Sequence, residues 1–390
     1  MPPLTRQGTL DSLELRAARS PKPAPPPCAR AGESRAGLSW QRLLLVLLLA
    51  ASPLAAQTEP RPAAPNERRA VIIDTDPGTD DAMAILLALS SPELDVRAFT
   101  VVPGNVTADQ ALDNALRLVS LAGRCDVPVA GGARRPLAQK LITAEFVHGE
   151  NGLAGIELPA PGCAADARFA PDLIIDLVHA MPGEITLVPV GPLTNIALAL
   201  LKDPTIVPLV KEVVIMGGSI TEGNVTAVAE ANIFNDPEAA ELVFQAGWKV
   251  TMVGLDVTHK TNFGRQHLER LARTHGTLND FATEVMAFLV ELAADFGADG
   301  TPMHDPLAVG VVLDPSFVRT RHMRIDVETR GEHTRGATVG NRHNAVERNE
   351  PEGDRLKMTG IDRVEPNAHV AVEVDAERFL ALFIERLRNR

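Results

Sequence analysis

The chain of 390 residues contains no tyrosine, and aromatic residues make up only 4% of it. A tyrosine hydroxyl is therefore excluded as a catalytic acid, and few rings are available to stack on a flat ligand. Cysteine is also scarce: Cys28, Cys125 and Cys163 form no C-x-x-C pair and lie near no histidine pattern, so no zinc site is visible. Cys125 and Cys163 either form a disulfide, as an exported protein permits, or remain free thiols, and the sequence leaves both readings open.

Positive charge is in short supply, with 38 lysine and arginine residues against 50 acidic residues and a formal net charge of −12. Beyond residue 56 the balance is 31 basic to 47 acidic residues, a net charge of −16. Binding to a phosphate backbone requires clustered lysine and arginine. We therefore expect no nucleic-acid partner, and a small molecule or a cation fits the charge better.

The apolar run Leu43–Ala50 is too short to span a bilayer comfortably, which takes roughly 20 residues. Basic residues precede this run and small residues follow it up to Ala56, as in a secretory signal. We therefore expect residues 1–56 to be a leader, the protein to be exported to the periplasm or secreted, and no stable membrane anchor to remain. A disordered tail with a membrane anchor is the alternative. Residues 57–67 are expected to be a linker and residues 68–390 a single domain.

From about Ala70 onward, short β-branched apolar runs alternate with helical patterns, which indicates an α/β protein. We expect a mostly parallel central sheet with helices on both faces, then a small C-terminal strand region and a final helix. The expected strands are Ala70–Thr75, Val96–Val102, Glu184–Val190, Glu212–Met216, Lys249–Val253, Met323–Thr329 and His369–Val374. The expected helices are Asp80–Leu89, Ala108–Leu121, Leu173–Ala180, Leu193–Lys202, Pro237–Ala246, Gln266–Thr274, Leu278–Phe296 and Ala376–Leu387. A polar stretch at 340–360 is expected to be a surface loop. Ligands of such sheets bind beyond the carboxyl ends of the strands, so functional residues should follow the strands directly.

The sharpest motif follows the first expected strand and reads Asp74-Thr75-Asp76-Pro77-Gly78-Thr79-Asp80-Asp81. Its Pro-Gly pair predicts a turn, and Thr79 is expected to cap the helix that follows. A helix N-terminus tolerates one anion well, but packed carboxylates raise one another's pKa and destabilise the fold unless a cation neutralises them. All the available ligands are oxygens, which suits Ca²⁺ or Mg²⁺. The alternative is that Thr79, Asp80 and Asp81 only cap and charge the start of the helix.

This motif resembles the N-terminal signature of the inosine-uridine-preferring nucleoside hydrolase family. Later segments agree with the family in order and spacing: Val102-Pro103-Gly104-Asn105, His148-Gly149-Glu150-Asn151-Gly152-Leu153, Val188 to Asn195, Met216-Gly217-Gly218, Gly223 to Asn232, and His304-Asp305-Pro306-Leu307-Ala308. The resemblance covers roughly residues 68–390. It departs from the family at Asn151, where the family has Asp, and at Ala231, where the family often has an aromatic residue. It implies a Rossmann-related, nucleoside hydrolase-like fold and calcium-dependent hydrolysis of ribonucleosides to free base and ribose.

The resemblance also implies a role for each matching residue. The protein ligands of a Ca²⁺ ion would be Asp76, Asp81, Asp305 and the backbone carbonyl of Val190. Asp76 would also be the general base for a cation-bound water, which attacks the anomeric carbon through an oxocarbenium-like transition state. The ribose hydroxyls would be held by Asp80, Asn105, Asn224, Glu230 and Asn232. Asp305 has a competing reading, because an aspartate before Pro306 also makes a good helix cap.

The leaving base must be neutralised, and His304 is the candidate acid because histidine titrates near neutral pH. His148 is expected to line the base side, with a hydrogen-bonding role in its loop as the alternative. Asn195 and Asn235 are expected to be structural. With tyrosine absent, Phe296 or a methionine remains as the group that stacks on the base. The sequence does not choose between purine and pyrimidine nucleosides, and the resemblance implies a homo-oligomer.

Two other functions stay open. A phosphatase of the haloacid dehalogenase type also carries Asp-x-Asp after its first strand, but it requires Thr or Val where this chain has Gly78. An exported ribose- or nucleoside-binding protein without turnover would share most of the site. The retained carboxylate of Asp76 argues against that loss of turnover.

Overall fold

The computed structural model describes residues 68–342, 346–347 and 365–388. The expected leader (1–56) and linker (57–67) lie outside the described residues, as does most of the expected loop at 340–360. The described residues belong to one compact unit. None of the helices among them is both long and apolar enough to cross a membrane.

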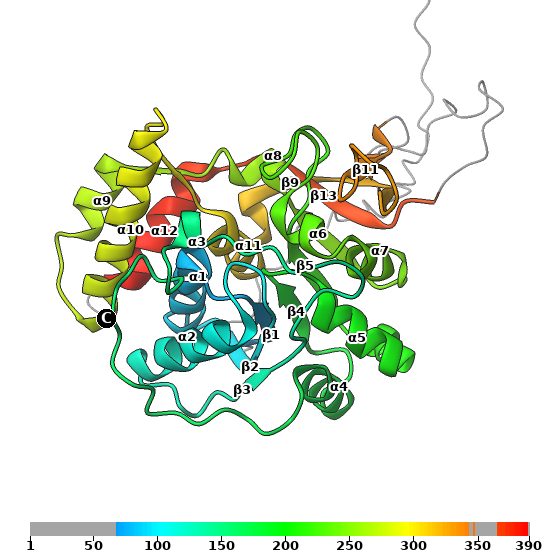
Figure 1. The fold of residues 1–390 in the computed structure, drawn as a ribbon, viewed down its shortest axis with the longest axis horizontal. Helices are drawn as coiled ribbons and strands as arrows, with labels where there is room; N and C mark the ends of the chain where they lie inside the picture. Colours follow the sequence, from blue (N-terminus) through cyan, green and yellow to red (C-terminus); the bar gives the residue numbers. More distant parts are fainter. Residues whose placement is uncertain (1–67, 343–345, 348–364, 389–390) are drawn as a thin grey trace, which may run out of the picture. The chain divides into compact units, whose positions relative to one another are not determined.

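Nine strands of the described chain form one sheet in the order β12-β9-β13-β6-β5-β4-β1-β2-β3 (Figure 1). Their bounds are β1 Arg69–Thr75, β2 Leu94–Val101, β3 Val129–Gly131, β4 Thr186–Pro189, β5 Glu212–Met216, β6 Val250–Val253, β9 Val318–Met323, β12 Val346–Glu347 and β13 Ala368–Val374. Every neighbouring pair from β13 to β3 is parallel, whereas β9 is antiparallel to both β13 and β12. The expected mostly parallel sheet is confirmed, and its antiparallel edge comes from the C-terminal part of the chain.

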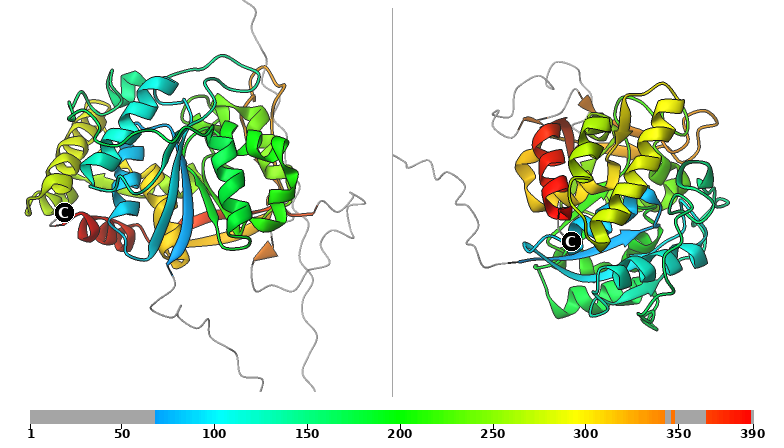
Figure 2. Two further views of the ribbon diagram at one scale, coloured as in Figure 1. Left: turned by 90° about the horizontal axis from the view of Figure 1, so that it is seen from below. Right: turned by 90° about the vertical axis from the view of Figure 1, so that its left-hand side faces the viewer.

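The helices cover both faces of this sheet, as expected. Their bounds are α1 Thr79–Leu89, α2 Ala108–Leu121, α3 Glu145–His148, α4 Ala170–Ala180, α5 Thr194–Lys202, α6 Ala231–Asn235, α7 Pro237–Gln245, α8 Leu255–Thr258, α9 Arg265–Leu271, α10 Thr277–Asp295, α11 His304–Leu313 and α12 Ala376–Leu387. Two short 3-10 helices span Pro204–Leu209 and Pro315–Phe317. In Figure 2 (left), α4, α5 and α7 lie on one side of the strands, and α1 and α2 lie on the other.

Each face of the sheet has its own hydrophobic core, and β1 contributes to both. Val71 and Ile73 belong to the core that includes α1, α2, α10, α11 and α12, whereas Ile72 belongs to the core with α4, α5 and α7. This alternation follows from the period of two in a strand. Because β1 is buried on both faces, its sequence reads as a continuous apolar run rather than as alternating apolar and polar residues.

The expected strand Met323–Thr329 is wrong in its bounds. The chain forms β9 up to Met323 and then a separate strand β10, Ile325–Val327, which pairs with β11, Thr338–Gly340, in a small second sheet. A third small sheet pairs β7, Asn262–Gly264, with β8, Gly300–Pro302. Asn367 explains the break, because its side chain accepts a hydrogen bond from the Ile325 amide and donates one to the Ile325 carbonyl. The backbone of Ile325 is thereby drawn away from the large sheet.

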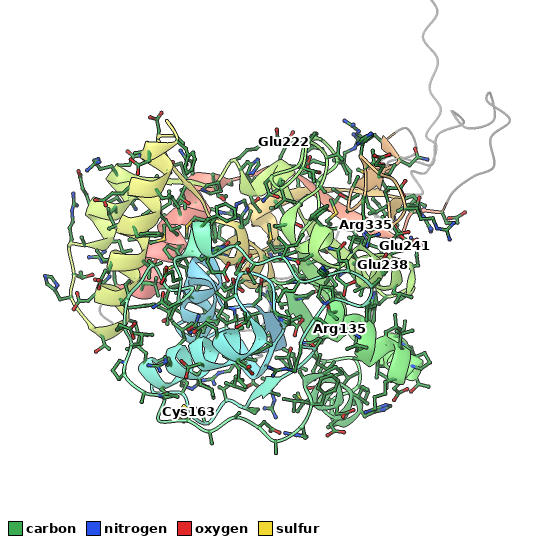
Figure 3. All side chains as sticks on the ribbon, viewed as in Figure 1. Arg135, Cys163, Glu222, Glu238, Glu241 and Arg335 are labelled. Carbon is green, nitrogen blue, oxygen red and sulfur yellow. A yellow bond between two sulfur atoms is a disulfide. The ribbon has the colours of Figure 1, made fainter. Side chains whose placement is uncertain are left out.

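Cys125 and Cys163 form a disulfide, with their Cα atoms 5.2 Å apart, so the reading as free thiols is wrong. Cys125 follows α2, and Cys163 lies in the extended segment between α3 and α4 (Figure 3). Ser120 of α2 supports the same junction, since its hydroxyl accepts hydrogen bonds from the Gly162 and Cys163 amides. The bond therefore fastens the segment that follows His148 to the outer helix α2.

Candidate active site

Polar residues gather where four neighbouring parallel strands end. Asp76 follows β1, Asn105 follows β2, Val190 follows β4, and Gly217 and Gly218 follow β5. These strands lie side by side in the sheet order β5-β4-β1-β2. As expected, the predicted residues Asp76, Asn105 and Val190 each follow a strand. They therefore lie at one edge of the sheet.

Three carboxylates form a group that can hold a metal ion. Oxygen atoms of Asp80, Asp81 and Asp305 lie within 4.8 Å of one another. Asp80 and Asp81 lie in the first turn of α1, and Asp305 lies in the first turn of α11. Helices α1 and α11 pack against each other, so their N-terminal ends bring these side chains together. Two helix N-termini offset part of the repulsion among the carboxylates.

Asp81 is held rigidly by four donors. Its Oδ1 accepts hydrogen bonds from the Thr75 hydroxyl at 2.5 Å and the Asp76 amide at 3.1 Å. Its Oδ2 accepts from the Gly78 amide at 3.0 Å and from Asn105 Nδ2 at 2.8 Å. The β1 end, the turn and the β2 end therefore all fix the position of one carboxylate.

Asp76 is enclosed by backbone. Its Oδ2 accepts a hydrogen bond from the Asn105 amide at 2.7 Å, while its buried Oδ1 has no hydrogen-bond partner. A Cβ atom added at Gly104 would lie 2.0 Å from Oδ2, and one added at Gly191 would lie 2.4 Å from Oδ1. Only glycine at these two positions allows the chain to approach the carboxylate this closely.

The carboxylates raise one another's pKa. Burial, followed by the charge of Asp81, raises the pKa of Asp76 well above its ordinary value. Burial and the charges of Asp80, Asp81 and Asp76 do the same to the pKa of Asp305. Burial also raises the pKa of Asp80, which has a buried Oδ1 without a partner. Buried, unpaired and mutually repelling oxygens are what a divalent cation neutralises, and an all-oxygen donor set suits a hard cation such as Ca²⁺.

The three-carboxylate group overlaps with the expected ligands Asp76, Asp81, Val190 and Asp305 at Asp81 and Asp305. Asp80, which was expected to contact ribose, belongs to the three-carboxylate group, whereas Asp76 lies outside it. The Val190 carbonyl accepts a hydrogen bond from Asn232 Nδ2 at 2.7 Å. Asn232 therefore contacts one of the expected ligand atoms directly.

The residues expected to hold ribose divide into three groups. Asn105 donates to the Asp81 carboxylate, and Asn232 donates to the Val190 carbonyl. Glu230 is buried, and its carboxylate accepts hydrogen bonds from the amides of Gly218, Asn232 and Ile233 at 2.9 to 3.1 Å, so it caps α6. Asn224 is exposed in the loop between β5 and α6, and its backbone amide bonds the Ala229 carbonyl. The structure thus brings Asn105, Glu230 and Asn232 together at the strand ends, near Asp80, and leaves Asn224 exposed.

Two histidines flank the carboxylates. His148 Nδ1 accepts a hydrogen bond from the Thr79 amide at 3.2 Å and lies 2.7 Å from the Thr79 hydroxyl and 3.8 Å from Asp80 Oδ1. Because Nδ1 is an acceptor, the proton of the neutral ring is on Nε2. His304 Nδ1 lies 2.8 Å from the Thr258 hydroxyl. Burial lowers the pKa of His148 to about 4 and that of His304 to about 3, so both rings are neutral at pH 7 in the cation-free protein.

Two expected helix caps are wrong. Gly78 rather than Thr79 is the N-cap of α1, because Asp81 reaches back to the Gly78 amide and leaves the Thr79 hydroxyl free to face His148. Met303 rather than Asp305 precedes α11, so Asp305 lies inside the helix and turns its side chain towards the other carboxylates. The Asn151 side chain forms hydrogen bonds with backbone groups of its own loop, at Leu153, Gly155 and Ile156.

The sequence analysis did not single out Asn114, and it assigned no role of its own to Asp74 within the acidic motif. Asn114 Nδ2 donates to the carbonyls of Pro77 and Asn151, and so joins the acidic turn to the His148 loop. Asp74 Oδ1 accepts from Thr100 and from Asn195, the latter structural as expected. Burial raises the pKa of Asp74 to about 7. A polar residue in the apolar stripe of α2 was the available signal for Asn114. Phe296, a candidate for base stacking, is 83% exposed after α10.

A sequence model of the family described as inosine-uridine preferring nucleoside hydrolase matches residues 71–381. The pyrimidine-specific ribonucleoside hydrolase RihA of Citrobacter koseri is 43% identical over 319 residues, covering 81% of this chain and 97% of that protein. The protein of the same name from Photobacterium profundum is 40% identical over 323 residues, covering 82% and 99%. All the site residues described above lie within the residues that the family model matches.

Solved structures also resemble most of the chain. A plant nucleoside hydrolase, the PpNRh1 enzyme, superposes with a TM-score of 0.75 at 38% identity, covering 83% of this chain and 99% of the other. A purine-preferring ribonucleoside hydrolase from Gardnerella vaginalis gives a TM-score of 0.73 at 35% identity, covering 82% and 98%. The fold is therefore shared with these enzymes.

Proposed function

The chain belongs to the inosine-uridine preferring nucleoside hydrolase family and is an N-glycosidase, and from this premise we propose that it hydrolyses pyrimidine ribonucleosides in a Ca²⁺-dependent reaction. The observation that carries the proposal is the group of the half-buried Asp80 and the buried Asp81 and Asp305, with Asp76 beside it, at the carboxyl ends of the parallel strands. The pyrimidine preference rests on the similarity to the two pyrimidine-specific relatives. The purine-preferring relative, at 35% identity, makes purine nucleosides the alternative.

The residues that would hold the cation are Asp80, Asp81 and Asp305, with Asp76 and the Val190 carbonyl as the further ligands that the family resemblance implies. When bound, Ca²⁺ supplies positive charge that offsets these carboxylates and lowers the pKa of a water molecule. Asp76 is suited to accept the proton of that water, because Oδ2 is fixed by the Asn105 amide while Oδ1 remains free. The surrounding carboxylates stabilise the positive charge that develops on the sugar.

On the side of the leaving base, we assign His304 and His148. His148 is buried and carries its proton on Nε2, and His304 is half-buried. His304 has Nδ1 engaged by Thr258, so Nε2 is the atom left to face the base. Asn105, Asn232 and Glu230 line the ribose side together with Asp80, and Asn224 would join them from its exposed loop.

We also propose that the protein is exported and forms a homo-oligomer. The disulfide between Cys125 and Cys163 supports export, because such bonds persist in oxidising compartments. The leader-like residues 1–56 agree with this proposal.

A panel of nucleosides tests the function. We expect purified protein to release ribose from uridine and cytidine faster than from inosine and adenosine, as measured by a reducing-sugar assay. Treatment with a chelator should abolish the release, and Ca²⁺ should restore it. Nucleoside recovered intact after hours with the calcium-loaded protein would instead indicate a binding protein without turnover.

A further inference from the structure

The short helix α8 connects two parts of the site that are distant in sequence. One side of α8 holds the start of the loop between β5 and α6. The Leu255 amide donates to the Gly218 carbonyl at 2.9 Å. Asp256 accepts hydrogen bonds from the Ile220 amide at 3.0 Å and the Thr221 hydroxyl at 2.7 Å. This loop continues through Asn224 to Glu230, which caps α6 at the ribose side.

His259 follows α8 directly. It contacts both the loop between β5 and α6 and His304, the histidine assigned to the leaving base. As the C-cap of α8, it places Nδ1 2.9 Å from Glu222 Oε1. Its ring also meets the ring of His304 edge-on, with centroids 5.6 Å apart and planes inclined by 64°. Figure 3 labels Glu222 on the loop beside α8. The Glu222 carboxylate forms an ion pair with His259, at the end of the helix.

We propose that His259 is a positioning residue for His304 and that Glu222 orients His259. The inference rests on the proposed function, in which His304 serves the leaving base. Thr258 holds His304 at Nδ1, but one hydrogen bond leaves the ring free to swing about that contact. The edge of the His259 ring limits this swing, and Glu222 fixes His259 in turn. The arrangement keeps Nε2 of His304 directed at the base.

A purely structural role explains this pair less well. The side chain of His259 is 32% exposed and that of Glu222 is 61% exposed. Ion pairs at such exposure contribute little to stability, because water screens them. Loss of the pair should therefore leave the fold intact, and its consequences should be seen in the reaction step that depends on His304.

Two substrates with different leaving groups provide the test. Nitrophenolate leaves from p-nitrophenyl β-D-ribofuranoside as a stable anion, whereas a leaving nucleobase gains from a hydrogen bond. The neutral His304 ring can donate that bond from Nε2 when Nδ1 accepts from Thr258. His259→Ala should lower kcat about tenfold on the best nucleoside, a part of the roughly 10²- to 10³-fold that one hydrogen-bond donor to a developing anion contributes. On the nitrophenyl riboside its kcat should stay within about twofold of wild type. Glu222→Ala should show the same split in a weaker form.

Asp256→Asn is the matched control. Asp256 lies on the same helix and holds the same loop, but it does not contact His304. We expect this variant to change KM for both substrates alike and to leave the ratio of their kcat values unchanged. In a His304→Ala background, His259→Ala should have no further effect on nucleosides, because the two residues act as one unit.

The outcomes separate the two proposals. Wild-type protein inactive on every nucleoside would contradict the proposed function itself. Active wild type, with His259→Ala either unchanged on nucleosides or slowed equally on both substrates, would overturn the positioning role. If His259→Ala fails to fold, the same comparison is made with Glu222→Ala, because the Glu222 side chain is exposed. An unchanged ratio of kcat on the nucleoside to kcat on the nitrophenyl riboside overturns the inference.

Discussion

Asp76 combines two demands that conflict at the scale of a single residue. Its carboxylate must be ionised to accept a proton, yet burial and the charge of Asp81 raise its pKa and favour the protonated form. The Asn105 amide offsets part of this cost by donating to Oδ2. The free Oδ1 remains without a partner in the protein. A cation close to this oxygen resolves the conflict, because it stabilises the ionised form.

We predict that Asp76→Asn lowers kcat by about 10²- to 10⁴-fold, the range that general base catalysis supplies. The amide keeps the shape of the side chain, so the variant should fold. Without Ca²⁺ its Tm should equal or exceed that of wild type, because one repelling carboxylate is gone. Nucleoside kinetics and calorimetry check both effects, and Asp95→Asn, at a half-buried position paired with Arg97, is the control. A variant with wild-type kcat would remove Asp76 from the chemistry.

At the scale of elements, the site is assembled from strand ends and helix starts. The ends of β1, β2 and β4 supply Asp76, Asn105 and Val190, and the first turns of α1 and α11 supply the three-carboxylate group. Segments without regular structure are fastened to these elements by side chains. Asn114 of α2 holds the His148 loop, and the disulfide holds the segment that follows it.

We predict that the disulfide stabilises the protein by about 2–4 kcal/mol, because it closes a long loop in the unfolded chain. The bond links residues separated by 38 positions. The double variant Cys125→Ser, Cys163→Ser should therefore unfold at lower urea concentration, with little change in kcat on nucleosides. Ser120→Ala is the matched control, since it removes the neighbouring hydroxyl and keeps the bond. Equal unfolding midpoints for the double variant and wild type would show that the bond does not stabilise the fold.

At the scale of the whole molecule, negative charge dominates both the surface and the site. The formal net charge is −12, and the strand edge adds buried carboxylates whose pKa values are raised. Such a molecule gains stability from any cation that binds the folded state alone. At a hundredfold excess over Kd, the gain is about 2.7 kcal/mol.

We predict that removal of Ca²⁺ lowers Tm, and lowers it more at high pH. In the cation-free protein the folded-state pKa of Asp74 is about 7, above the ordinary 3.8, and those of Asp76 and Asp305 are also raised. The folded state therefore binds more protons, so stability falls as pH rises from about 4 towards the raised values. Bound Ca²⁺ offsets this loss, and its effect on Tm should be larger at pH 8 than at pH 5.5. Calorimetry with and without chelator measures the difference, and an effect independent of pH would contradict it.

The sequence by itself determined the local features. The alternation of apolar runs predicted the parallel sheet, and the bounds of α2, β5 and α12 agree with expectation because strong periodic patterns define them. The motif from Asp74 to Asp81 predicted the acidic cluster, since its residues are neighbours along the chain. Asp305 was placed in the site only through its family motif, because no local signal links it to Asp76, which lies 229 positions earlier in the chain.

Tertiary structure alone decided the remaining features, because they depend on which elements meet. The antiparallel strand β9, the bond between Cys125 and Cys163 and the grouping of Asp80 with Asp305 all join segments that no periodicity relates. The contacts of His259 with Glu222 and His304 have the same origin. The packing of separate elements determines which side chains meet. A single sequence indicates which residues are buried, but not which residues they contact.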